Sequence, residues 1–201
     1  MNRCHPAFWR QRWSTALLLL LITSAAYAAP GLQVQKITDS VFALVGPFGN
    51  RSAENLGNNA TFGFIVTDEG VILIDAGGSY LGAKAIQSAI AEVTTQPVKI
   101  VVNTGGQDHR WLGNGYFKEH GARIIASSRA VEDHKARTRD QLMALDNLVG
   151  LKGREGTAPV YADEVFDDSL DITLGGVRLS FTMWARRIPR ATCSPGCRRS
   201  R

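Results

Sequence analysis

Short apolar runs alternate with polar residues in the first part of the chain. Residues 32–45 contain two roughly alternating apolar stretches with a polar turn between them, and this pattern predicts one or two strands. Residues 61–67 and 71–75 predict two more strands, and residues 68–70 between them have the composition of a hairpin turn. Because residues 71–75 are almost continuously apolar, we expect that strand to be buried on both faces.

A helical period follows these strands. Residues 80–93 carry apolar side chains at helical spacing, and residues 99–103 form another apolar run. A strand, a helix and a strand within about 30 residues predict a βαβ-like unit. A glycine-rich loop then occupies residues 104–115. Beyond it the pattern predicts a short helix at 116–121, a strand at 122–126 and a long polar helix at 128–149. Residues 160–174 are expected to be extended, and residues 177–182 to complete a hairpin through Gly175-Gly176.

The first 28 residues have the composition of a secretory signal peptide. Three arginines precede a leucine-rich core at residues 16–26, and Ala26-Tyr27-Ala28 fits the small-x-small pattern of a cleavage site. The apolar run of about 11 residues is shorter than the roughly 20 that a membrane span requires. We expect cleavage after Ala28, a periplasmic or secreted product and no stable membrane span; the alternative is a short uncleaved anchor.

Charge and cysteine content divide the chain into the same three parts. The net charge is +5, but nine arginines and no acidic residues lie in residues 1–28 and 183–201. Residues 29–182 therefore hold 14 basic and 18 acidic residues, a net charge of −4. This mildly acidic body lacks the basic stripe of a nucleic-acid-binding protein, so we expect no nucleic-acid partner. It also holds no cysteine, so no disulfide framework is expected in it.

The pattern changes after Thr182. Residues 183–201 contain six arginines, two prolines and two cysteines without sustained periodicity, which is typical of a disordered basic tail. A second interpretation is a frameshift. Read one base late, GC-rich codons for His-Val-Gly-Pro-Ala-His-Thr-Pro-Gly-Asp can encode residues 183–192. The DNA beyond codon 182 distinguishes the two.

The order and spacing of three segments resemble the metallo-β-lactamase superfamily. The strand pair that ends at Asp75 resembles the first signature of the superfamily. Residues 101–104, followed by Leu-Gly-Asn at 112–114, resemble the flanks of its metal loop. The hypothetical original frame after Thr182 would supply a third segment, which contains a histidine.

The resemblance covers about residues 32–182 and implies an α/β (α+β) fold. The superfamily has a four-layer αβ/βα sandwich of two similar halves, with zinc between them at the strand ends. Residues 29–182 would form a truncated version of that domain, consisting of the first half and the start of the second. The sheet face that meets the missing half should then be exposed and prone to aggregation.

The metal loop departs from the pattern of the superfamily. That pattern is Thr-His-x-His-x-Asp-His, one residue, then Leu-Gly-Asn, and its ligands hold zinc ions that activate a water molecule. Aligned without gaps, this chain has Gly105 and Gln107 at the first two histidines, His109 at the aspartate and Arg110 at the last histidine. A one-residue gap would place Asp108 and His109 on the Asp-His pair but would break the Leu-Gly-Asn register.

The candidate metal ligands that remain are Gln107, Asp108 and His109. Tight zinc sites use three or four protein ligands, so the resemblance implies zinc for the superfamily but we do not expect tight binding by this chain. The alternative role of His109 is a polar loop residue bonded to Asp108. Three further residues are expected to orient the loop, namely Asp75, Arg110 and Asn114. The alternative role of Asp75 is a strand-end cap.

Three other side chains have simpler interpretations. Trp111 is expected in the core, and His120 and His134 on the solvated faces of helices.

The loop leaves three functional hypotheses. The first is a hydrolase homologue for a small ester, lactone, lactam or thioester, inactive as this chain. The second is a non-catalytic binding module, in which Arg110 recognises a small anionic ligand. The third is a pseudogene product that does not accumulate.

Overall fold

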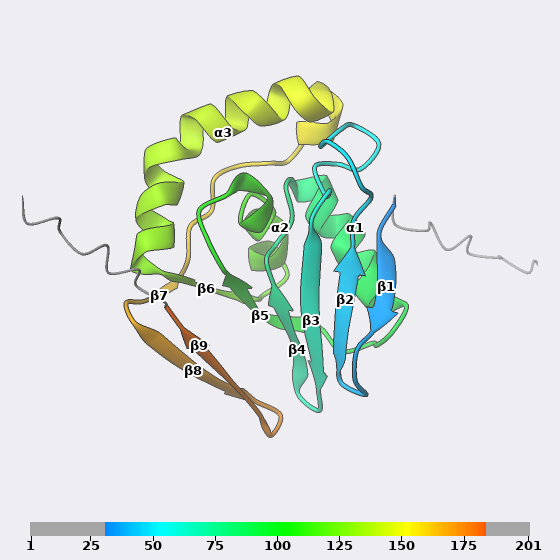
Figure 1. Cartoon of the computed structure of the whole chain (residues 1–201), viewed down its shortest axis with the longest axis vertical. Helices are drawn as coiled ribbons and strands as arrows, with labels where there is room; N and C mark the ends of the chain where they lie inside the picture. Colours follow the sequence, from blue (N-terminus) through cyan, green and yellow to red (C-terminus); the bar gives the residue numbers. More distant parts are fainter. Residues whose placement is uncertain (1–30, 184–201) are drawn as a thin grey trace, which may run out of the picture.

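The computed structural model describes residues 31–183, so the expected signal segment and nearly all of the arginine-rich tail lie outside the described residues. A seven-stranded sheet in sequential order β1 to β7 forms the centre of this part (Figure 1). Its first four strands are antiparallel, whereas β4 to β7 are parallel. The strands are β1 (Gln33–Lys36), β2 (Val41–Val45), β3 (Thr61–Thr67), β4 (Gly70–Ile74), β5 (Val98–Asn103), β6 (Arg123–Ser127) and β7 (Glu164–Phe166).

Helices α1 (Tyr80–Ala91) and α2 (Asn114–Glu119) cover one face of the sheet (Figure 1). One stripe of α1 is buried because its apolar side chains recur at helical spacing. This stripe packs against the aromatic and aliphatic side chains of β2, β3 and β4. Its members are Gly82, Ala83, Ala85, Ile86, Ala89 and Ile90.

The opposite face of the sheet is covered by a hairpin of β8 (Ser169–Leu174) and β9 (Val177–Thr182). Ile172 of the hairpin is 3% exposed and belongs to one cluster with five buried sheet residues. Those five residues are Ile65, Ile72, Ile100, Val102 and Ile125. The expectation that this face would be exposed is therefore wrong over β3 to β6, because the alternating hairpin turns one apolar side toward the sheet.

The elements expected from the hydrophobic pattern are present. The long helix α3 (Ser128–Arg154) continues past its expected end, through a break at Gly150, whose φ is 71°. It arches over the end of the sheet where β4 and β5 finish (Figure 1). No helix within residues 31–183 combines the length and the apolar character that a membrane crossing requires.

The segment 46–59 between β2 and β3 is anchored at the start of α1. The Asn58 side chain donates to the Gly82 carbonyl at 2.8 Å and accepts from the Gly78 amide at 3.1 Å. Gly57 and Gly78 approach so closely that a Cβ at Gly78 would lie 2.5 Å from the Gly57 carbonyl oxygen. These contacts bring the segment beside the glycine-rich loop that follows β5.

Candidate functional site

Asp75 follows β4 directly and ties this strand to the glycine-rich loop. Its φ of 66° lies in the left-handed region, which is uncommon for a residue with a side chain. Its carboxylate accepts from the Thr104 amide at 2.7 Å and from the Thr104 hydroxyl at 2.8 Å. Burial raises the pKa of Asp75, while the bonds from Thr104 and the charge of Arg110 oppose this rise.

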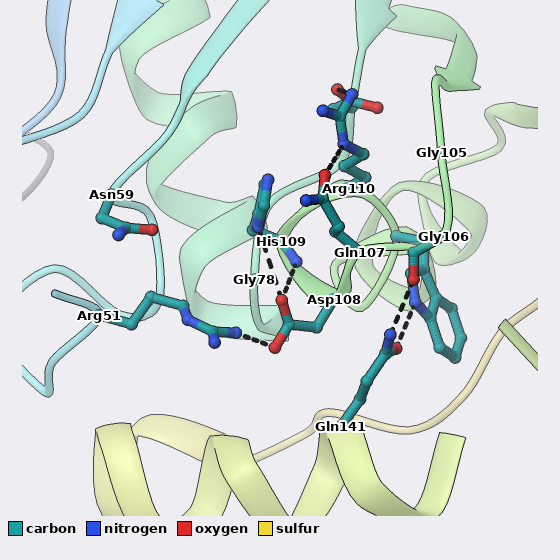
Figure 2. A network of polar contacts seen from close by, with 12 residues as sticks. Arg51, Asn59, Gly78, Gly105, Gly106, Gln107, Asp108, His109, Arg110 and Gln141 are labelled. Atoms are coloured by element: carbon teal, nitrogen blue, oxygen red, sulfur yellow. Dashed lines mark hydrogen bonds and ion pairs between the residues drawn. The ribbon is translucent and has the colours of Figure 1, made fainter. Parts of the chain in front are cut away.

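Arg110 lies at the end of a short 3₁₀ helix, η1 (Asp108–Arg110), and bonds back to the start of the loop. Its Nε donates to the Gln107 side chain at 2.8 Å (Figure 2). Its Nη1 lies 3.3 Å from the Asp75 carboxylate and also contacts the Thr104 hydroxyl. Its backbone carbonyl accepts from the Ala76 amide at 2.9 Å. Arg110 is thus engaged within the loop itself.

Asn114, the first residue of α2, is fully buried beneath the loop and is bonded to the end of β5. Its side chain exchanges two hydrogen bonds with that of Asn103, at 2.9 and 3.0 Å, and donates to the Val160 carbonyl at 2.9 Å. Asn103 also donates to the Arg110 carbonyl at 2.7 Å. Asn114 therefore links the end of β5 to the segment before β7 and has no free group to offer a ligand.

Asp108 and His109 of η1 face Arg51 (Figure 2), with Asp108 buried and His109 partly exposed. The Asp108 carboxylate pairs with the Arg51 guanidinium and accepts from the His109 amide at 2.9 Å. The His109 Nδ1 lies 3.5 Å from the same carboxylate. Burial lowers the pKa of His109, as do the charges of Arg110 and Arg51, against an opposing effect of Asp75. Sequence reasoning did not find Arg51, which lies 57 positions before Asp108 in a loop without periodicity.

A cleft of about 510 Å³ opens between η1, the segment 46–59 and α3. Its charged lining balances, with Arg51 and Arg137 against Asp108 and Asp140. Arg51 pairs with Asp108, and Arg137 pairs with Asp133 at 3.1 Å. The remaining lining residues are Asn59, Gln107, His109, Gln141 and Ala144.

Trp111 and His134 form a buried stack behind the loop. Both are 0% exposed, and their ring centroids lie 4.6 Å apart with planes 19° from parallel. Trp111 is in the core as expected. The solvated position expected for His134 is wrong, because one side of the polar helix α3 packs against the loop instead of facing solvent; His120 is exposed, as expected.

The donor set of the loop does not fit a zinc ion. Gly105 offers no side chain, the Asp108 carboxylate is already paired with Arg51, and the Asp75 carboxylate is engaged by Thr104 and Arg110. His109 is left as one imidazole beside two guanidinium groups. Within residues 31–183, no group of three or more His, Cys, Asp or Glu side chains is arranged to hold a metal ion.

The described residues are similar to a solved structure of a metallo-β-lactamase from Pontibacter korlensis. The TM-score is 0.50 and the sequence identity 21%, over 74% of this chain and 59% of that chain. This chain therefore spans about three fifths of the solved protein. No family model matches the chain, and no curated protein matches it.

The chain has the metallo-β-lactamase fold. The described part is a partial αβ/βα sandwich: helices, a seven-stranded sheet and the two-stranded sheet that faces it. This is the fold that the resemblance implied from the sequence.

Proposed function

We propose that this chain is a homologue of metallo-β-lactamase-fold hydrolases that cleave small esters, lactones, lactams or thioesters, and that it does not itself perform zinc-dependent hydrolysis. The observation that carries the proposal is the pairing of Asp108 with Arg51 beside His109. Zinc hydrolases hold the metal ion with at least three protein ligands, and the metal ion lowers the pKa of a bound water to near neutral. This loop offers the single imidazole of His109, which is fewer ligands than a catalytic zinc ion requires.

The positive charges around His109 add to this argument. Arg51 and Arg110 both lower the pKa of His109, which means that each places positive potential at the imidazole. The same potential disfavours a divalent cation at that place. Gln107 does not compensate, because its side-chain oxygen accepts from Arg110.

An activity assay tests the proposal. The chain would be incubated with a chromogenic cephalosporin, a p-nitrophenyl ester, a lactone and a thioester, in excess zinc and in EDTA. We expect rates equal to those of buffer alone in both conditions. Zinc-dependent turnover that the His109→Ala variant abolishes would contradict the proposal.

A second candidate is a module that binds a small ligand without catalysis. The observation that favours it is the cleft, whose volume of about 510 Å³ lies within the range of small-molecule sites. Recognition of an anion by Arg110 is not favoured, because Gln107, Thr104 and Asp75 engage its guanidinium. Arg51 and Arg137 line the cleft, but each is paired with a carboxylate, so a polar ligand of low net charge fits better.

Thermal shift measurements separate the two candidates. A panel of neutral polar metabolites, small carboxylates and phosphates would be tested with the chain and with Gln107→Leu, which alters the cleft lining. A saturable rise in Tm in EDTA that Gln107→Leu removes supports a binding module. No rise with any compound leaves the inactive homologue as the better description.

Export to the periplasm or the medium is also part of the proposal, and it rests on the arginines, apolar core and Ala26-Tyr27-Ala28 of the first segment. Intact mass measurement of the protein expressed in a bacterium tests it. We expect a mature chain that begins at Ala29. A product that retains residues 1–28 would contradict export with cleavage.

A further inference from the structure

The glycine pair Gly105-Gly106 is packed directly against α3. A Cβ built on Gly106 would overlap the Asp133 carboxylate and would lie 2.7 Å from the Asp133 Cβ, which no rotamer change can move. The three atoms nearest to a Cβ on Gly105 would instead all belong to Arg110, and the closest of them, Cδ, would lie at an ordinary 3.4 Å. The two neighbouring glycines therefore differ: the close approach of the loop to α3 requires a glycine at 106 but not at 105.

The carbonyl groups of the same two glycines accept hydrogen bonds from α3. The His134 Nε2 donates to the Gly105 carbonyl at 2.9 Å. The Gln141 Nε2 donates to the Gly106 carbonyl at 2.7 Å (Figure 2). Because a carbonyl only accepts, His134 must carry a proton on Nε2. His134 and Gln141 are seven positions apart, so they lie on one face of the helix.

Trp111 closes the contact from the other end of the loop. Its indole Nε1 donates to the Gln141 side-chain oxygen at 2.8 Å, and its ring stacks between His134 and Tyr161. Gln141 is 4% exposed and thus binds both the glycine pair and Trp111 inside the protein. Because both ends of its buried amide are bonded, Gln141 fixes the relative placement of the groups that it joins. The His134 Nδ1, by contrast, is buried without a partner among the described residues.

We propose that α3, through His134, Gln141 and the close contact of Asp133 with Gly106, holds the loop 104–111 in shape and so positions Asp108 and His109 in the cleft without a metal ion. His134 and Gln141 are positioning residues in this account. The inference rests on the proposed function, in which the loop does not hold zinc, but it makes a separate claim.

A pair of alanine variants of the full chain tests the steric contact. We expect Gly106→Ala to lower Tm by at least about 4 °C, because overpacking must displace the loop or the helix. The matched control Gly105→Ala should change Tm by less than about 2 °C. In an Asp133→Gly background, the effect of Gly106→Ala should fall by half or more. Equal effects of the two alanines, or an undiminished effect in that background, would overturn the steric part.

Amide hydrogen exchange, observed by NMR in EDTA, tests the positioning. The amides of Arg110 and Leu112 bond within the loop, to Gln107 and Asp108, and we expect both to be protected with no metal present. Gln141→Leu should reduce this protection at least about tenfold relative to Ile65 in β3, and should shift the Trp111 indole resonance.

Zinc is then added to the same samples. The inference predicts unchanged loop protection, whether or not zinc binding is detected elsewhere. Loop amides that exchange freely in EDTA and become protected only with zinc would overturn it. Because zinc stoichiometry is measured separately, an unprotected loop without zinc binding would refute the positioning role of α3 while leaving the proposed function intact.

Discussion

At the scale of single residues, Asp75 and Arg110 connect the end of β4 to η1. The Asp75 side chain is 9% exposed and the Arg110 side chain 31% exposed, so the pair is partly screened by solvent. Breaking such a pair costs more than its net attraction, because the buried carboxylate loses a partner that it cannot replace with water. The pair therefore maintains the loop rather than contacting a ligand.

Replacing Arg110 by Gln should lower the free energy of unfolding by about 1–2 kcal/mol, since Thr104 alone would then bind the Asp75 carboxylate. Arg123→Gln is the matched control, because the ion pair of Arg123 with Glu164 is exposed, at 52% and 41%. Arg123→Gln should lower the free energy of unfolding by no more than about 0.5 kcal/mol. Urea unfolding at pH 7 measures both, and equal costs would argue against a role of Arg110 in the loop.

The buried His134 should make the free energy of unfolding depend on pH. Burial lowers its pKa below the ordinary 6.5, opposed by the Gly105 bond and by Asp133. The stability contributed by the neutral, buried ring is present above pH 6.5 and is lost as pH falls through the lowered pKa. Between pH 7 and 5 the wild type should lose stability more steeply than His134→Gln, by up to about 1.4 kcal/mol per pH unit. Parallel profiles of unfolding free energy against pH would contradict this.

At the scale of secondary-structure elements, the sequence predicts the order and type of the strands and helices because apolar side chains recur with periods of two and 3.6 residues. Contacts between elements are harder to predict from the sequence. Arg51 is invisible in the pattern, because an ion pair with Asp108 across 57 positions leaves no periodic signal. The predicted position of His134 is wrong because a polar helix normally exposes its histidines to water, whereas α3 packs one of its faces against the loop.

The hairpin β8–β9 covers one face of the sheet through Ile172. Ile172→Ala should lower the free energy of unfolding by about 2–4 kcal/mol, because it leaves a cavity between the hairpin and the sheet residues Ile65 and Ile72. The exposed neighbour Thr173 is the control, and Thr173→Ala should cost less than about 1 kcal/mol. Similar values from urea unfolding would mean that the hairpin does not cover the sheet in solution.

At the scale of the whole molecule, the fold was accessible from the sequence and the chemistry of the site only in part. The first signature ends at Asp75, directly after β4, and the Leu-Gly-Asn flank leads into α2, so their spacing relative to regular elements indicates the fold. The donors Gln107, Asp108 and His109 lie in an irregular loop, where the partners of each side chain decide its role. Their pairing with Arg110 and Arg51 became evident only in three dimensions.

The central claim is that this metallo-β-lactamase-fold chain does not use its loop as a zinc site. Zinc stoichiometry after dialysis of the full chain against micromolar zinc tests it most directly, measured by elemental mass spectrometry beside the His109→Ala variant. The account predicts a zinc content well below one ion per chain, equal in the two proteins. A content near one ion per chain that falls when His109 is replaced would contradict it.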